Sequence, residues 1–254
     1  MHKLKHKLSE RVCLGLVVMY PAPGIVECIG ADWDWIWLDG QHGQLDESTW
    51  LPMVRAADIV NRPAIIRVPE LSYGKIGRAL DTGAAGIIVP MINTRHQAEA
   101  AVEAARFPPG VCRSFGGRRP IDMRGRNYAS DANEDILLAL QIETYKGLEN
   151  VEDIASTPGV DALIFGPDDM AMQNGINMKD ARSVDFLGEE LKRVSKVTEK
   201  AGILAGTTTG SAERLRFVAS LGYRMCTGCG DKSLLVSGSE SGSAAMKAVI
   251  GAKD

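Results

Sequence analysis

The stretch DWIWLDGQHG, residues 34–43, joins a run of residues that are usually buried to an acid, two glycines and a histidine. A nearly continuous apolar run of this length is typical of a strand that is buried on both faces, as in a parallel sheet. The polar residues that follow it then lie at the carboxyl end of that strand. The fold depends on whether the rest of the chain repeats this pattern.

The pattern recurs along the whole chain. Segments with helical spacing, such as residues 48–60, 74–84, 95–107 and 212–222, separate short apolar runs. Strands that alternate with helices in this way predict a (β/α)8 TIM barrel, an α/β fold, with a doubly wound sheet as the alternative. The eight predicted strands are residues 13–19, 34–39, 63–68, 86–91, 137–143, 162–165, 202–206 and 223–228.

The length and composition favour a single domain. The chain has 254 residues, 45% of them hydrophobic, which is enough to bury one large core. We predict one domain over residues 1–254, with the barrel at about residues 10–236 and a tail at about 237–254. The tail begins as a flexible Ser/Gly segment and ends in a short helix, which packs either on a partner subunit as a swapped helix or on its own barrel.

The charge of the chain limits its partners. A formal net charge of −3 provides no basic surface for phosphates, which argues against a nucleic-acid partner. The basic N-terminal segment MHKLKHKLSER lacks the apolar core of a signal peptide, and no apolar run is long enough to span a membrane. We therefore expect a cytoplasmic protein that does not associate with membranes.

The five cysteines are an odd number, which fits reduced thiols better than a disulfide framework. Cys226 and Cys229 form a C-x-x-C pair, whose spacing is compatible with redox or metal chemistry. No second Cys or His pair supports a zinc site. The preferred interpretation is a strand end followed by a glycine turn.

Several predicted strands end in polar side chains, where barrel enzymes place their chemistry. Arg67 lies on one of these strands, Gln141 and Glu143 share a face of another, and Asp168 and Asp169 follow a third. Glu143 and one of the two aspartates can share a hard cation such as Mg²⁺ or Mn²⁺. Each acid has an alternative role as a helix cap or a surface charge.

The opening stretch has two interpretations. Taken alone, Asp39 is a helix cap and His42 an exposed loop residue. If the other polar strand ends gather at the same rim of a barrel, His42 instead belongs to a group of polar residues at the functional end of the barrel. The remaining motifs of the chain favour the second interpretation.

Five motifs follow one another along the chain: WDWIWLDGQHGQLD (33–46), IIRVPELSYGKIGRALDTGAAGIIVPMINT (65–94), ARFPPGVCRSFG (105–116), LALQIET (138–144) and VDALIFGPDDMAMQNG (160–175). This ordered set resembles the HpcH/HpaI aldolase family, the metal-dependent pyruvate aldolases that include 4-hydroxy-2-oxoheptanedioate and 2-dehydro-3-deoxyglucarate aldolases. The resemblance covers roughly residues 10–236, and its specificity comes from the order and spacing of the set.

The resemblance implies a role for each matching position. Glu143 and Asp169 match the metal carboxylates, and the metal would be Mg²⁺, Mn²⁺ or Co²⁺. Arg67 and Gln141 match the residues that contact pyruvate. A histidine and aspartate dyad matches His42 and Asp81, and the turn at Gly166, Pro167 and Asp168 would meet the substrate carboxylate through backbone amides.

The resemblance also implies the reaction and the assembly. The protein would be a class II aldolase that cleaves a 4-hydroxy-2-oxo acid to pyruvate, or hydroxypyruvate, and an aldehyde. The metal would stabilise the enolate of the 2-oxo acid, with Arg67 adding positive charge. His42, oriented by Asp81, would take the hydroxyl proton at C4. The assembly would be a homo-oligomer, a hexamer.

Alternatives stay open at this point. A citrate-lyase-like or malyl-CoA-lyase-like enzyme would use the same metal chemistry on a thioester, and a non-catalytic barrel would bind a 2-oxo acid without needing the dyad. A Schiff-base aldolase is disfavoured because no predicted strand contains a lysine. The arginine-rich segment 113–126 is either a solvated loop or one that reaches the barrel mouth or a neighbouring subunit.

Overall fold

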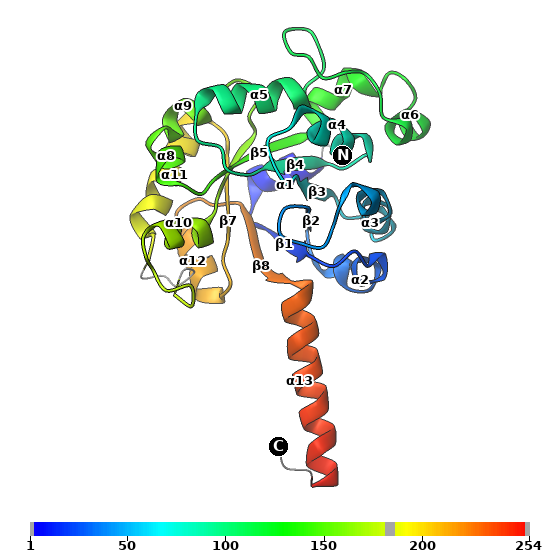
Figure 1. Ribbon diagram of the computed structural model, residues 1–254, viewed down its shortest axis with the longest axis vertical. Helices are drawn as coiled ribbons and strands as arrows, with labels where there is room; N and C mark the ends of the chain where they lie inside the picture. Colours follow the sequence, from blue (N-terminus) through cyan, green and yellow to red (C-terminus); the bar gives the residue numbers. More distant parts are fainter. Residues whose placement is uncertain (1–2, 181–185, 252–254) are drawn as a thin grey trace.

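The structure, a computed structural model, describes residues 3–180 and 186–251. Eight parallel strands pair in sequence order, and β8 pairs with β1 to close the barrel (Figure 1). The predicted (β/α)8 TIM barrel is therefore confirmed, and the doubly wound sheet is wrong. The strands are β1 (Cys13–Val18), β2 (Trp35–Asp39), β3 (Ala64–Arg67), β4 (Gly86–Val89), β5 (Leu137–Ile142), β6 (Ala162–Phe165), β7 (Leu204–Thr208) and β8 (Met225–Gly230).

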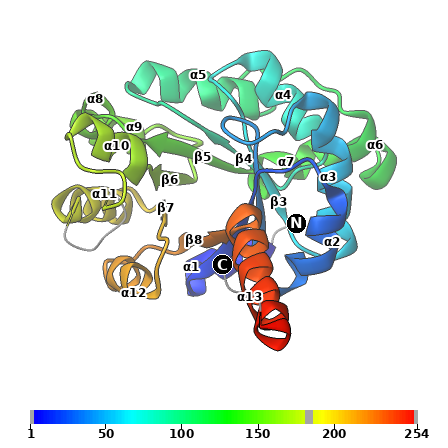
Figure 2. The ribbon, with the colours of Figure 1, turned by 60° about the horizontal axis from the view of Figure 1, so that its bottom comes forward.

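Helices surround the strands in the order that the sequence predicts (Figure 2). The four segments with helical spacing are all helical, with bounds that differ from the prediction by no more than three residues. The helices are α1 (Lys3–Glu10), α2 (Pro23–Ile29), η1 (Gly30–Asp32), α3 (Glu47–Ile59), α4 (Tyr73–Asp81), α5 (Arg95–Ala105), α6 (Arg118–Arg124), α7 (Tyr128–Asp135), α8 (Tyr145–Glu149), α9 (Val151–Ala155), α10 (Pro167–Gln173), α11 (Gly188–Ala201), α12 (Ala212–Ser220) and α13 (Asp231–Ile250).

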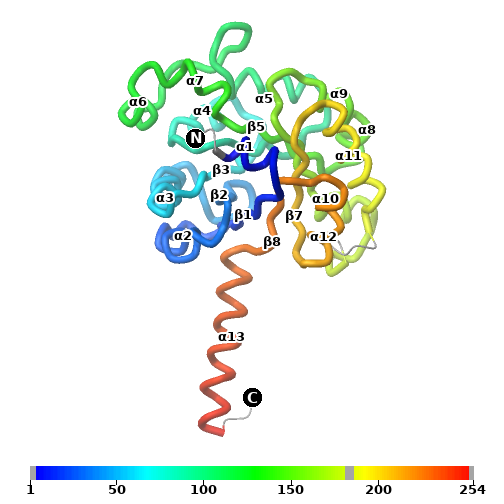
Figure 3. The backbone as a smooth tube through the Cα atoms, turned by 180° about the vertical axis from the view of Figure 1, so that it is seen from behind, coloured from blue at the N-terminus to red at the C-terminus, as the bar shows by residue number. Residues whose placement is uncertain are grey.

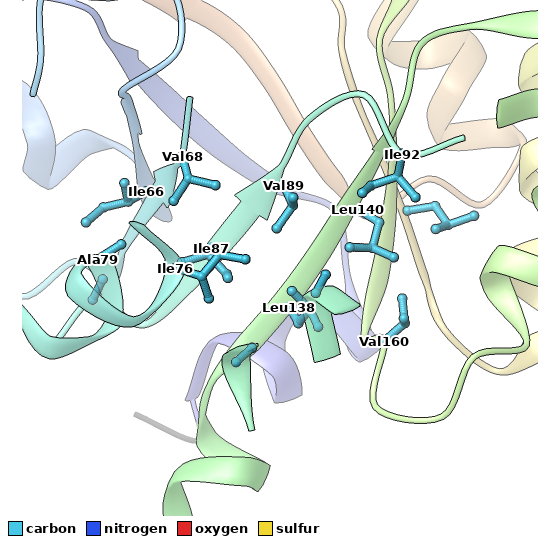
Figure 4. Packing of buried hydrophobic residues seen from close by; sticks show 14 of the residues in the cluster. Ile66, Val68, Ile76, Ala79, Ile87, Val89, Ile92, Leu138, Leu140 and Val160 are labelled. Carbon is cyan, nitrogen blue, oxygen red and sulfur yellow. The ribbon is translucent and has the colours of Figure 1, made fainter. Parts of the chain in front are cut away.

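Each strand contributes side chains to two separate hydrophobic cores. Ile66 of β3, Ile87 of β4 and Leu138 of β5 face the helices, as Figure 4 shows. Their sequence neighbours Ile65 and Ile88 belong to the second core, inside the barrel. Successive strand residues point to opposite faces, so both cores require apolar residues. This explains the continuous apolar runs in the sequence.

Helix α1 closes the amino-terminal end of the barrel. Leu4 and Leu8 are buried in the same cluster as the barrel interior. The Lys5 ammonium lies 2.8 Å from the Asp161 carboxylate, which ties the helix to the segment before β6. Figure 3 shows α1 lying against the strands. Helix α1 is thus an amphipathic helix whose apolar side chains cover the end of the barrel, a role that was not predicted from the sequence.

Helix α13 leaves the barrel after β8 and projects away from it (Figures 1 and 3). The predicted flexible start of the tail is wrong, because one helix runs from Asp231 to Ile250 through Gly238 and Gly242. Ser and Gly are tolerated here because the helix starts from a capped end and is flanked by good helix formers. Packing of the tail on its own barrel is also wrong, since Val249 is 84% exposed.

All five cysteines are free thiols. Cys226 is buried in β8, and burial raises the pKa of its thiol to about 12. No group of three or more His, Cys, Asp or Glu side chains in residues 3–180 and 186–251 is arranged to hold a metal ion. Both Cys226 and Cys229 lie in β8, so the predicted strand is confirmed, whereas the predicted glycine turn is wrong because β8 continues through Gly228 to Gly230.

The arginine-rich segment 113–126 is held by acids of its own chain. Arg113 is buried and donates to Asp81, Arg119 pairs with Asp58, and Arg124 lies 2.7 Å from a carboxylate oxygen of Asp135. No arginine of the segment lines the large cavity at the barrel mouth. The segment is therefore anchored to its own chain by part of its arginines, whereas Arg118 and Arg126 are exposed to solvent, and it does not form a wall of the mouth. None of the described helices has the length and apolarity needed to cross a membrane.

Candidate active site

A cavity of 820 Å³ opens at the carboxyl ends of the barrel strands. Barrel enzymes bind their substrates at this end, because the loops after the strands gather there. The lining residues come from almost every part of the rim. Seven of the residues singled out from the sequence line it: His42, Arg67, Gln141, Gly166, Pro167, Asp168 and Asp169.

Asp39 and Arg67 form a buried ion pair at the ends of β2 and β3, where the two residues lie opposite each other in register. Arg67 Nε lies 3.0 Å from Asp39 Oδ1, and Arg67 Nη2 lies 2.6 Å from Oδ2. Burial acts to raise the pKa of Asp39, but the hydrogen bond and charge of Arg67 outweigh it and lower that pKa. The carboxylate therefore stays ionised and fixes the guanidinium.

The loop after Asp39 wraps closely around this ion pair. The amides of Gln41 and His42 donate to Asp39 Oδ1 at 3.0 and 3.1 Å. A Cβ at Gly40 would lie 2.8 Å from the carbonyl oxygen of Arg67, and a Cβ at Gly43 would collide with the carbonyl oxygen of Asp39. The strand ends in this polar, glycine-containing sequence because only such a turn can pack here and leave His42 at the mouth.

Asp39 is therefore not the helix cap that the simpler interpretation assigned. The cap of α3 is Asp46, whose side chain accepts hydrogen bonds from the amides of Ser48 and Thr49. Asp39 was not among the site residues predicted from the sequence. A signal was present, since an acid ends one predicted strand and an arginine is the last but one residue of the next, and such ends are neighbours in a parallel barrel.

Arg67 also links this ion pair to the rest of the site. Its Nη1 lies 3.4 Å from Gln141 Oε1, and its guanidinium carbon lies 5.2 Å from the centre of the Trp37 ring. The planar group is therefore held from three sides. Its position is set before any substrate binds.

Glu143 lies just past the end of β5, and its side chain is buried. Its Oε1 accepts from the Met91 amide at 2.8 Å, and its Oε2 accepts from Gln141 Nε2 at 2.6 Å. Met91 has a φ of 57°, an uncommon value for a residue other than glycine, which aims its amide at the carboxylate. Both oxygens of Glu143 are thus fixed in place.

Asp169, in the first turn of α10, interacts directly with Glu143. Burial first, and then the negative charge of Asp169, raise the pKa of Glu143 to about 7, against the opposing hydrogen bond from Met91. A Cβ at Gly166 would lie 2.7 Å from Glu143 Cβ and 2.8 Å from Oε2, so only glycine fits between the two acids. The turn at Gly166 and Pro167 therefore brings the carboxylates together.

These two carboxylates fit the predicted metal. Two acids that repel each other in a buried site need a positive counter-charge, and their oxygen atoms are the ligands that Mg²⁺ and Mn²⁺ prefer. The described chain adds no third His, Cys, Asp or Glu to the group. The remaining ligands would come from water or substrate, as is usual for Mg²⁺.

His42 and Asp81 do not form a dyad within one chain. His42 lies at the cavity, at the carboxyl ends of the strands. Asp81 ends α4, which returns the chain to the amino-terminal ends of the strands, and its Oδ1 accepts from Arg113 at 3.1 Å. The resemblance implied the dyad from matching motifs alone, which do not show that the helix between the strands carries Asp81 to the other end of the barrel.

Lys232 and Thr208 also line the cavity and were not singled out from the sequence. Lys232 lies in the first turn of α13, directly after β8. It was missed because the chain was predicted to continue from here into a flexible tail, which would begin at about residue 237. The barrel closure explains its position, since every segment that follows a strand begins at the same rim.

Known proteins are similar to this chain over most of its length. A 4-hydroxy-2-oxovalerate aldolase of Novosphingobium aromaticivorans is 37% identical over 201 residues, which are 76% of each chain. A hydroxypyruvate/pyruvate aldolase of Rhizorhabdus wittichii is 30% identical over 208 residues, 80% of this chain and 81% of that one.

The fold comparison covers nearly the whole chain. The crystal structure of an HpcH/HpaI aldolase/citrate lyase family protein from Burkholderia cenocepacia superposes with a TM-score of 0.86 at 28% identity, and covers 97% of this chain and 100% of that one. The family model for HpcH/HpaI aldolase/citrate lyase matches residues 22–236. The chain therefore belongs to the HpcH/HpaI aldolase/citrate lyase family.

Proposed function

We propose that this chain is a divalent-metal-dependent aldolase that reversibly cleaves a 4-hydroxy-2-oxo acid to pyruvate, or hydroxypyruvate, and an aldehyde. The observation that carries the proposal is the pair of the buried Glu143 and the half-buried Asp169, with Gln141 and Arg67 beside it, at the barrel mouth. The aldolase names of the two relatives described above support the same reaction class.

Glu143 and Asp169 would hold the metal, Mg²⁺, Mn²⁺ or Co²⁺. When bound, the cation supplies Lewis-acid charge next to the carbonyl oxygen of the 2-oxo acid. Arg67 adds a fixed positive charge where negative charge develops on that oxygen. Because Asp39 already holds the guanidinium in this position, Arg67 does not have to reorient during the reaction. Gln141 donates to Glu143 and orients it.

His42 is the proton-transfer residue in this proposal. It is exposed at the cavity, and its backbone amide is bound to Asp39. In the cleavage direction it would take the proton of the C4 hydroxyl, directly or through a water molecule, as the bond between C3 and C4 breaks. Gly166, Pro167 and Asp168 would lie along the carboxylate of the 2-oxo acid.

A Schiff-base mechanism is a poorer fit to the site. Lys232 is the only lysine among the described residues that line the cavity, and its side chain is exposed on α13. A lysine that forms a Schiff base needs a desolvated or cationic environment that makes the free amine available. Borohydride treatment in the presence of pyruvate should accordingly leave the mass of the chain unchanged.

The proposal is tested by exchange of the pyruvate methyl protons in heavy water, followed by NMR. We expect exchange with Mn²⁺ or Mg²⁺ present, and its loss after exhaustive chelation and in Glu143→Gln. Cleavage of a 4-hydroxy-2-oxo acid should be lost in parallel. Binding of pyruvate without exchange would identify a non-catalytic 2-oxo acid binder, and full activity after chelation would exclude the metal-dependent mechanism.

The projecting helix α13 supports a homo-oligomer, which we propose to be a hexamer. Leu235, Val236, Met246, Val249 and Ile250 are 48% to 84% exposed in the single chain. An isolated helix of this length is marginal in water, so its apolar side chains need a partner surface. Sedimentation should show an assembly that is lost when Met246, Val249 and Ile250 are changed to serine; a monomer at micromolar concentration in the parent would contradict it.

A further inference from the structure

Lys232 places a second cation on the wall of the cavity. The cationic residues of the described chain that line the cavity are Arg67 and Lys232, apart from His42. Arg67 is neutralised by Asp39. The ammonium of Lys232 has no ion-pair partner within residues 3–180 and 186–251. A cation of this kind is available to a ligand.

Lys232 lies apart from Glu143 on the rim of the mouth, and one strand, β7, separates β8 from the strand that precedes Asp169. Strand β8, which precedes it, pairs with β7 and β1, whereas Glu143 follows β5. In a closed barrel of eight strands, two strands lie between β5 and β8 in one direction and four in the other. A ligand whose 2-oxo acid end occupies the site at Glu143 therefore extends toward Lys232 with its other end.

The backbone of Lys232 is fixed at this rim. Asp231 is fully buried, and its Oδ2 accepts from the amides of Met19 and Tyr20 at 3.0 Å each, in the loop after β1. Its Oδ1 accepts from the amide of Lys232 at 2.7 Å. The first turn of α13 is thus tied to the barrel, even though the rest of the helix projects from it. The lysine is held at the mouth by this carboxylate.

From this geometry we infer that Lys232 determines substrate specificity by binding a carboxylate at the far end of the aldehyde, as in an ω-carboxy aldehyde. The inference rests on the proposed aldolase function. The charges of the cavity favour this orientation, because Arg67 is already paired with Asp39, whereas the ammonium of Lys232 is available to attract an anionic end to its part of the wall. A neutral aldehyde gains nothing from the ammonium.

The test compares aldehydes of equal length that differ in the terminal charge, with pyruvate as the nucleophile. Succinic semialdehyde and butanal form one pair, and glyoxylate and acetaldehyde form another. In Lys232→Met, kcat/KM for succinic semialdehyde should fall about tenfold, mainly through KM, because one charged hydrogen bond is lost. The value for butanal should change by less than about twofold, which is within the usual effect of an exposed substitution.

Two further variants sharpen the comparison. Lys232→Arg keeps the charge and should retain most of the preference for succinic semialdehyde. Lys146→Met is the matched control, because Lys146 is also an exposed lysine at the second position of a helix that follows a barrel strand, and it does not line the cavity. It should leave all four aldehydes unaffected. The preference of the parent enzyme should also weaken as salt is raised.

The outcomes separate this inference from the proposed function. An equal loss for charged and neutral aldehydes in Lys232→Met, or a parent enzyme with no preference for the carboxylated member of either pair, would overturn the role of Lys232 while methyl-proton exchange of pyruvate continues. Absence of both exchange and aldol product with every aldehyde would overturn the proposed function, and this inference with it.

Discussion

Asp39 binds Arg67 through both of its carboxylate oxygens, at 3.0 Å from Nε and 2.6 Å from Nη2, at the ends of two neighbouring strands. The side chain of Asp39 is 3% exposed and that of Arg67 is 10% exposed, so each of these buried charges needs the other as its counter-charge. The pair leaves Arg67 Nη1 directed at Gln141, which in turn donates to Glu143. One ion pair therefore sets the geometry of the whole polar site.

Asp39→Asn should destabilise the protein by about 3 kcal/mol, because it leaves the buried guanidinium without its counter-charge. Urea unfolding measures this, and Glu99→Gln is the control, since the Arg95–Glu99 pair is exposed and should contribute less than about 1 kcal/mol. The pKa of Asp39 is lowered in the folded state. Its contribution should therefore be present above its ordinary pKa and be lost as pH falls through the lowered value. Equal effects of the two substitutions would contradict the assigned role of the pair.

His42→Ala should slow cleavage of a 4-hydroxy-2-oxo acid about 10²–10⁴-fold, the usual effect of removing a positioned proton-transfer group. Metal and pyruvate binding should be kept, because the contacts assigned to them come from Arg67, Gln141, Glu143 and Asp169. Titration of Mn²⁺ and pyruvate into His42→Ala and Glu143→Ala separates the two defects. Cleavage at the parent rate between about pH 6 and 9, or loss of metal binding as complete as in Glu143→Ala, would show that the role is wrongly assigned.

Gly166→Ala should weaken metal binding about tenfold or more, since displacing a residue that supports a metal ligand commonly has an effect of this size. The added Cβ would lie 2.7 Å from Glu143 Cβ and would push that carboxylate away from Asp169. Gly77→Ala is the control, because no atom lies within 4 Å of its Cβ position in α4. Mn²⁺ affinity by calorimetry should fall only in the first variant, and an unchanged affinity would remove the steric argument for Gly166.

The stability of the metal-free protein should fall as pH rises from 5 through about 7. Burial and the charge of Asp169 raise the pKa of Glu143 to about 7 from its ordinary 4.5, so the unfolded chain loses this proton at lower pH than the folded one does. The fold therefore favours the protonated acid, and its contribution is lost above that pKa. Thermal unfolding of the parent and of Glu143→Gln measures the effect, which should be absent in the variant.

The same raised pKa predicts how metal binding depends on pH. A cation must displace the proton of Glu143, so the apparent affinity should rise with pH up to about 7 and level off above it. Calorimetry in buffers of different ionisation enthalpy should detect release of a proton below that pH. An affinity that is constant between about pH 5 and 8 would show that Glu143 is already ionised in the metal-free protein.

Local sequence patterns were enough to predict the barrel and most of its rim. Strands buried on both faces must be apolar throughout, so residues 34–39 and 86–91 were recognisable without any tertiary information. Their polar ends then had to meet at one end of a parallel barrel, which is why Arg67, Gln141 and Asp169 could be grouped in advance. These inferences need only local periodicity and the direction of the strands.

The contacts between the polar groups could not be predicted in the same way. Asp39 pairs with Arg67 because of the register between β2 and β3, and Asp81 binds Arg113 because α4 carries it to the opposite end of the barrel. Lys232 reaches the mouth because β8 closes on β1. Local sequence patterns specify the faces of an element, whereas contacts between side chains distant in sequence depend on register and closure, which arise when all eight strands pack together.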